Sequence, residues 1–347
     1  MDTEDSTSNG TYAVSTPQRT GEVPVAHTMS EHRLAVGSSD RLLTLFLRIG
    51  VAVLVIGLVG FGFLYYRDQY VPPAPSMLQQ QLSLTEASVR KNPNNVEARL
   101  QLGLVYGQAK RYDDAIAQYD QVLKVAPESK DALVGKGFAL MEKGQLDKAT
   151  ASLTKVVKAT RTGEFANSDS SLGAAYYYLG IIALKQQKPA NAIEQLRHAL
   201  AIEPTDSDSM YQIGLAQLQM GKQADAVATF KNALRFVPTG WCEPYQQLQV
   251  AYTSMKKPEL AAYASAMAGF CGKRVDQAKT QLTALTSGPA AVDAMLGLGL
   301  IAETENDTKG AAAWYEKALA KDPRNMTAMS SLSALGVTPG AKPTAKK

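Results

Sequence analysis

The sequence predicts an all-α protein in which one transmembrane helix precedes an α-solenoid of stacked helical hairpins. Residues 49–66 form a long apolar stretch without a charged side chain. From residue 77 onward, small and large side chains recur at helical spacing, with a period of about 34 residues. Tryptophan and phenylalanine are scarce, 2 and 8 in 347 residues, which favours packed helices over an aromatic-rich sheet.

Residues 42–66 are the predicted transmembrane helix, which would bind the lipid bilayer. At about 1.5 Å per residue, the charge-free part alone spans roughly 27 Å, close to the hydrocarbon thickness of a membrane. Arg48 lies near one end, and Tyr65, Tyr66 and Arg67 form an interfacial anchor at the other. A buried helix or a cleaved signal peptide is the alternative. The stretch is too long for a signal peptide, and no small-residue cleavage site follows it.

The flanking segments are polar or rich in proline. Residues 1–40 are predicted to be a disordered tail, because they bury too little apolar surface to offset chain entropy. Residues 67–76 contain Pro72, Pro73 and Pro75, which predict a stiff stalk. Residues 336–347 are predicted to be a second disordered tail.

The orientation of the span is predicted from the basic residues near its ends. Arg33, Arg41 and Arg48 precede it, whereas Arg67 alone follows closely. Basic residues favour the cytoplasmic side, so the C-terminal domain is expected outside the cytoplasm. The difference is small, and a cytoplasm-facing domain stays open as the alternative.

Three series of residues recur along the chain at a constant spacing from one another. Each glycine of the first series precedes an alanine by twelve residues and a large residue by sixteen. The glycines are Gly103, Gly137, Gly180, Gly214 and Gly299, the alanines Ala115, Ala149, Ala192, Ala226 and Ala311, and the large residues Tyr119, Leu153, Leu196, Phe230 and Tyr315. Antiparallel helices approach closely where small side chains face each other, so we expect the large residues to fill the grooves between hairpins.

This pattern resembles the tetratricopeptide repeat family over residues 77–335. The resemblance implies about six helical hairpins, with capping half-repeats at residues 77–91 and 326–335. Two departures stand out. Residues 161–172 form a polar insertion, which either contacts a partner or is tolerated surface variation. In the fifth repeat Gln249 replaces the glycine and Ser265 the large residue, and an additional helix is expected from Val275 to Leu285.

The resemblance also implies a concave groove lined by the first helices of successive repeats. The residues that match its wall are apolar or aromatic: Leu104, Phe138, Met141, Tyr177, Ile181, Tyr211 and Leu215. Such a groove suits an amphipathic helix or an extended apolar segment of a partner protein. The alternative is that several of these side chains pack between neighbouring hairpins.

The cysteines Cys242 and Cys271 fall at the start of one helix and at the end of its antiparallel neighbour. These two ends lie side by side in a hairpin, so a disulfide is predicted, and it would require an oxidising compartment. The alternative is a pair of buried free thiols.

No motif for catalysis or for a cofactor stands out, so the chain is predicted not to be an enzyme and to bind no cofactor or metal. His27, His32 and His198 are scattered, and residues 297–302 match a dinucleotide fingerprint by letters only, without a preceding strand. The net charge of +4 is interleaved, which argues against nucleic acid as a partner.

The predicted function is therefore that of a membrane-tethered scaffold that binds a partner protein, outside the cytoplasm, in envelope assembly, secretion or complex maturation. A cytoplasm-facing adaptor, a subunit of a membrane enzyme complex and a self-assembling structural protein stay open as alternatives. The sequence does not define the oligomeric state.

Overall fold

A computed structural model of the chain describes residues 38–70 and 75–337. In these two ranges the secondary structure is helical, without a strand. Pro72, Pro73 and most of both predicted tails lie outside the described residues. The chain divides into two compact units, Met1–Ala74 and Pro75–Lys347. The first contains helix α1 (Ser38–Tyr70) and the second contains all the later helices.

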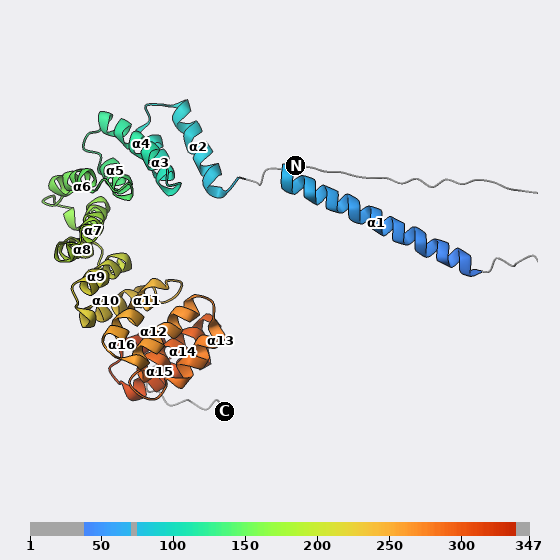
Figure 1. Cartoon of the computed structure of the whole chain (residues 1–347). Coiled ribbons are helices and arrows are strands. Elements are labelled where there is room, and N and C mark those ends of the chain that lie inside the picture. Colours follow the sequence, from blue (N-terminus) through green and yellow to red (C-terminus); the bar gives the residue numbers. More distant parts are fainter. Residues whose placement is uncertain (1–37, 71–74, 338–347) are drawn as a thin grey trace, which may run out of the picture. The chain divides into compact units, whose positions relative to one another are not determined.

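The helices of the second unit follow one another in pairs. Figure 1 shows α2 to α10 along an arc and α11 to α16 gathered after it. Their bounds are α2 Met77–Lys91, α3 Val96–Gln108, α4 Tyr112–Val125, α5 Lys130–Glu142, α6 Leu146–Thr160, α7 Ser170–Lys185, α8 Pro189–Ile202, α9 Ser207–Gln219, α10 Gln223–Phe236, α11 Glu243–Ser254, α12 Pro258–Cys271, α13 Val275–Ala284, α14 Ala291–Thr304, α15 Thr308–Lys321 and α16 Met326–Ala334.

Helix α1 carries the long apolar stretch. Its segment Leu42–Asp68 has a mean hydropathy of 2.6, and none of it is buried within the structure. By length and composition this helix could cross a membrane.

The same turn joins the first helix of each hairpin to the second. It contains one residue with a left-handed backbone, such as Lys110 with φ 58° or Gly144 with φ 74°. The next residue donates its backbone N–H to a carbonyl five residues earlier, as Arg111 does to Tyr106 at 2.8 Å. This bond is the mark of a Schellman motif, which ends the first helix and turns the chain back.

Each glycine of the periodic series faces the large residue of its own hairpin. A Cβ atom on Gly103 would lie 2.7 Å from Cε1 of Tyr119. Gly137 faces Leu153, Gly180 faces Leu196, Gly214 faces Phe230 and Gly299 faces Tyr315 in the same way. The expectation that the large residues fill only the space between hairpins is therefore incomplete. Tyr119 does both, because a Cβ on Gly135 of the next hairpin would also touch its ring, at 2.4 Å.

Helix α12 belongs to two hairpins at once. A left-handed turn at Lys256 (φ 55°) joins it to α11, and a second one at Lys273 (φ 65°) joins it to α13. In the second hairpin Ala266, Ala278 and Leu282 keep the spacing of twelve and sixteen residues, and all three are buried. The additional helix expected near residue 275 is thus α13, and α12 serves as the first helix of its hairpin.

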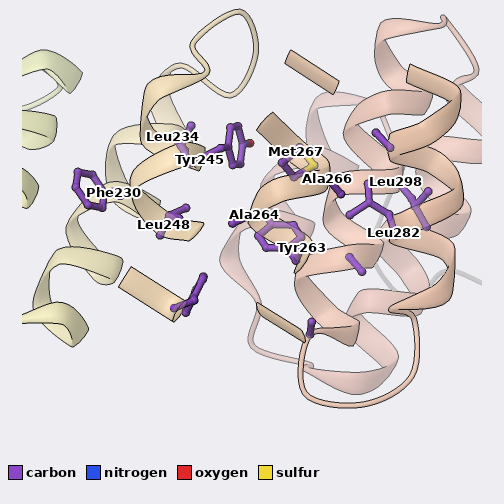
Figure 2. Close-up of a cluster of buried hydrophobic side chains, with 14 of the residues drawn as sticks. Phe230, Leu234, Tyr245, Leu248, Tyr263, Ala264, Ala266, Met267, Leu282 and Leu298 are labelled. Carbon is purple, nitrogen blue, oxygen red and sulfur yellow. The ribbon is translucent and has the colours of Figure 1, made fainter. Parts of the chain in front are cut away.

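This junction contains a large hydrophobic cluster. Figure 2 shows Tyr263 and Met267 of α12 between Tyr245 of α11 on one side and Leu282 and Leu298 on the other. Tyr263 is buried, which raises the pKa of its hydroxyl well above the usual value. The cluster continues to Phe230 of α10, so the irregular repeat has a buried core that is continuous with that of the regular hairpin before it.

The array begins and ends with a single helix in place of a complete hairpin. Helix α2 begins with a capping box, in which Ser76 and Gln79 exchange side-chain and backbone hydrogen bonds. Helix α16 is capped at its N-terminus by Asn325, whose side chain accepts the N–H of Ala328 at 3.0 Å. Leu332 of α16 is fully buried against the preceding hairpin.

Candidate functional site

A hollow of about 630 Å³ opens on the first helices of three successive hairpins, α3, α5 and α7. We call it the α3/α5/α7 groove. Its lining residues are Glu97, Leu100, Gln101, Leu104, Gly107 and Gln108 of α3, Ala115 and Tyr119 of α4, Asp131, Val134, Gly135, Phe138 and Ala139 of α5, and Ser170, Ser171, Ala174 and Tyr178 of α7. The floor is apolar, with polar side chains at the edges. A volume of this size is typical of ligand pockets.

Two rings that line this groove, Phe138 and Tyr178, belong to a longer series of aromatic contacts. The ring centroids of Tyr112 and Phe138 are 6.2 Å apart and nearly perpendicular. Phe138 and Tyr178 are 5.4 Å apart, and Tyr178 and Tyr177 are also 5.4 Å apart. Edge and tilted contacts of this kind are favourable and stabilise the packing of Phe138 and Tyr178.

Two of the predicted groove residues lie in this groove. Leu104 is 49% exposed, high for a leucine, and Phe138 is half-buried between the rings of Tyr112 and Tyr178. Both line the hollow. These two side chains are therefore available to a partner.

The other predicted groove residues are placed differently. Met141 is only 2% exposed and packs in the core with Leu153, so it presents no surface to the groove. Ile181 packs against the same core, and Leu215 against the junction cluster. Tyr211 contacts Phe230 and Trp241, at centroid distances of 5.6 and 5.2 Å.

Tyr177 lines a smaller adjoining hollow of about 220 Å³, and Tyr178 takes the place expected for it in the main groove. Three consecutive tyrosines, Tyr176 to Tyr178, point in different directions because successive helical side chains are about 100° apart. Tyr176 stacks on His198 of α8, at 4.8 Å. The rotation of α7 about its axis decides which ring faces the groove, and the sequence gives no signal for it.

Acidic side chains stand at one edge of both hollows. Glu97 and Asp131 line the main groove, and Glu203, Asp206 and Asp208 line the adjoining hollow. Partial burial raises the pKa of Asp208, and the neighbouring Asp206 raises it further. No lysine or arginine lines either hollow.

A third hollow, of about 730 Å³, lies between α10, α12, α14 and α16. Its wall contains an ion pair in which Lys231 Nζ lies 2.6 Å from Asp293 Oδ1, across 62 residues of sequence. Burial lowers the pKa of Lys231, but Asp293 and Tyr252 outweigh it and raise the pKa on balance. The sharing of α12 between two hairpins brings α10 and α14 together here.

The cysteines are joined in the structure. The Cα atoms of Cys242 and Cys271 are 5.4 Å apart and their sulfurs are bonded. The bond connects the start of α11 with the end of α12, beside the shared helix. Within the described ranges, no group of histidine, cysteine, aspartate or glutamate residues has the arrangement of a metal site.

The fold defines the class of protein: a helical-repeat array of the kind that serves as a scaffold for protein–protein interactions. The chain belongs to the tetratricopeptide repeat family. Family models described as tetratricopeptide repeats match residues 83–119, 100–164 and 272–325, residues 173–206, and residues 208–239, together more than half of the chain. No curated protein is significantly similar to it.

Several solved structures resemble the array. The crystal structure of MamA is 24% identical, with 52% of this chain and 94% of that chain covered and a TM-score of 0.43. A chain in the crystal structure of the APC/C hetero-tetramer Cut9–Hcn1 is 17% identical, with 75% of this chain and 46% of that chain covered and a TM-score of 0.47. YrrB, described as having an unusual peptide-binding site, is 15% identical, with 73% and 99% covered and a TM-score of 0.36.

Proposed function

We propose that this chain is a membrane-tethered scaffold that holds a segment of a partner protein in the α3/α5/α7 groove. The observation that carries the proposal is the apolar wall on three successive first helices, where Leu104 is exposed and Phe138 is half-buried. Exposed apolar and aromatic side chains in a rigid concave surface are the usual anchors of a protein interface.

The tether is helix α1. Its segment Leu42–Asp68 has a mean hydropathy of 2.6 and is long enough to cross a bilayer. A bilayer would remove the apolar surface of this helix from water, which stabilises the inserted helix by roughly 25 cal/mol per Å² of apolar area. Membrane attachment confines the scaffold to two dimensions, which raises its encounter rate with partners in the same membrane.

The expected location of the repeats is outside the cytoplasm. The arginine distribution around the span and the Cys242–Cys271 bond both favour this side, because disulfides persist in oxidising compartments. A role in envelope assembly, secretion or complex maturation fits such a scaffold.

Site-specific photocrosslinking tests the groove. A photoreactive amino acid at Leu104 is expected to capture a partner in native membranes, and capture should be lost with Phe138→Ala. The control position is Val125, which is 71% exposed at the end of α4 and does not line the groove. Capture that is equal at both positions, or unchanged by Phe138→Ala, would show that the groove is not the binding surface.

A reporter fused after Lys347 tests the location. Alkaline phosphatase, which requires an oxidising compartment, is expected to be active in this fusion, whereas a cytoplasmic reporter should be inactive. The opposite result would place the scaffold in the cytoplasm and leave the groove hypothesis intact.

A further inference from the structure

The charges around the groove are of one sign. The main groove and the adjoining hollow share Ser170, Ala174 and Tyr178 in their linings, so they meet at α7, and we call the two hollows together the depression. The charged side chains that line it are all carboxylates: Glu97, Asp131, Glu203, Asp206 and Asp208. This is notable in a chain whose net charge is +4, because basic residues are slightly in excess elsewhere.

Three of these acids occupy one register position. Glu97, Asp131 and Asp208 each precede the periodic glycine of their hairpin by six residues and stand in the first turn of a first helix. Equivalent positions of successive repeats lie side by side in a solenoid. The acids therefore lie along one edge of the depression, where Ala174 of α7 takes the same register position between Asp131 and Asp208.

Three lysines near the groove form ion pairs with acids that do not line it. Lys136 pairs with Asp120 at 2.5 Å, Lys130 pairs with Asp169 and Lys143 with Asp113. By contrast, Glu97 and Asp131 accept hydrogen bonds from neutral donors. The donors are Gln101, at 3.1 Å, and Ser171, at 2.7 Å. Within the described part of the chain, no lysine or arginine forms an ion pair with Glu97, Asp131 or Asp208.

The chain itself shows how this register position binds a cation. Asp293 precedes Gly299 by six residues, as Glu97 precedes Gly103, and it holds Lys231 Nζ at 2.6 Å. Lys231 reaches it from another hairpin, and both residues line the third hollow. A lysine or arginine from a partner could reach the three groove acids in the same way.

We propose that the groove selects a partner segment that is both apolar and basic, with lysine or arginine side chains along the edge where Glu97, Asp131 and Asp208 stand. This inference rests on the proposed function and adds the chemistry of the partner. Leu104, Phe138 and Tyr178 bind the apolar side chains of the segment, and the carboxylates bind its cations. An acidic segment is rejected, because its charges would meet like charges at the edge.

The experiment is a selection from a display library of random sixteen-residue segments on the full-length chain in detergent. A parallel selection on the Phe138→Ala variant identifies the segments that depend on the groove. We expect those segments to be enriched in lysine and arginine together with large apolar residues. A representative segment should bind the triple variant Glu97→Gln, Asp131→Asn, Asp208→Asn roughly tenfold more weakly, and its affinity should fall with added salt.

A matched triple variant controls for loss of first-turn acids. Asp147→Asn, Asp225→Asn and Asp276→Asn neutralise acids in the first turns of α6, α10 and α13, which do not line the depression. Its binding should equal that of the original chain. Groove-dependent segments that are neutral or acidic would overturn the charge selection and leave the groove intact. If no segment depends on Phe138, both the inference and the proposed function are wrong.

Discussion

The Cβ position of Gly103 lies 2.7 Å from Cε1 of Tyr119, so the first helix of this hairpin has no room for a side chain at that point. The same relation recurs in four other hairpins, with Leu153, Leu196, Phe230 and Tyr315 as the large residues. Real Cβ atoms do not approach ring carbons so closely, and Tyr119 is 5% exposed with little freedom to move. Close packing of glycine against a large side chain thus sets the distance between paired helices.

Replacing Gly103 by alanine is expected to destabilise the chain by about 1–3 kcal/mol, because the added methyl group forces the Tyr119 ring to shift. Gly107→Ala is the control in the same helix. The nearest atom to its added Cβ lies 3.8 Å away, so this change should be neutral or stabilise by up to about 1 kcal/mol. Urea denaturation followed by circular dichroism measures both. Equal effects of the two variants would contradict the packing relation.

The buried hydroxyl of Tyr119 is expected to make the folded protein less stable at alkaline pH. Burial raises the pKa of its hydroxyl from 10.0 to about 12, so between these values the unfolded chain loses this proton while the folded chain keeps it. Stability should therefore fall by roughly 1.4 kcal/mol per pH unit between pH 10 and 12 from this group alone. The Tyr119→Phe variant, compared with the original chain at pH 9 and pH 11, should lose less stability. Identical pH dependence of the two chains would exclude this origin.

The disulfide is expected to stabilise the junction of α11, α12 and α13. Its cysteines are 29 residues apart, and closing such a loop contributes roughly 3–4 kcal/mol in the chain-entropy model. The variant Cys242→Ser, Cys271→Ser should lose about this much, and reductant should destabilise the original chain but not the variant. Thiol labelling of the unreduced, denatured chain checks the bond itself. Complete labelling of both cysteines would refute it.

The ion pair of Lys231 and Asp293 should show a favourable coupling of about 1 kcal/mol, because both side chains keep some contact with solvent, 41% and 17%. The double-mutant cycle uses Lys231→Met, Asp293→Asn and their combination at pH 7. The raised pKa of Lys231 means that this stabilisation is fully present below the unfolded pKa and is lost as pH rises through the folded one. Additive single changes would show that the pair does not hold α10 to α14.

Much of the array was predictable, because its signals are local. The spacing of twelve and sixteen residues identified the hairpins, and the resulting family and all-α fold are confirmed. The positions of Leu104 and Phe138 also followed from register. The predicted positions of Met141 and Tyr177 in the groove do not agree with the structure. A helix with apolar residues on more than one side does not reveal which side faces its neighbours.

The sequence by itself determined which segments become helices, where they turn and which small residues let them approach, since these depend on neighbours within one hairpin. The tertiary structure decided the rest. It made α12 a member of two hairpins, and it brought Lys231 to Asp293 across 62 residues. Such contacts depend on how each helix rotates and stacks against distant ones, which no local periodicity encodes.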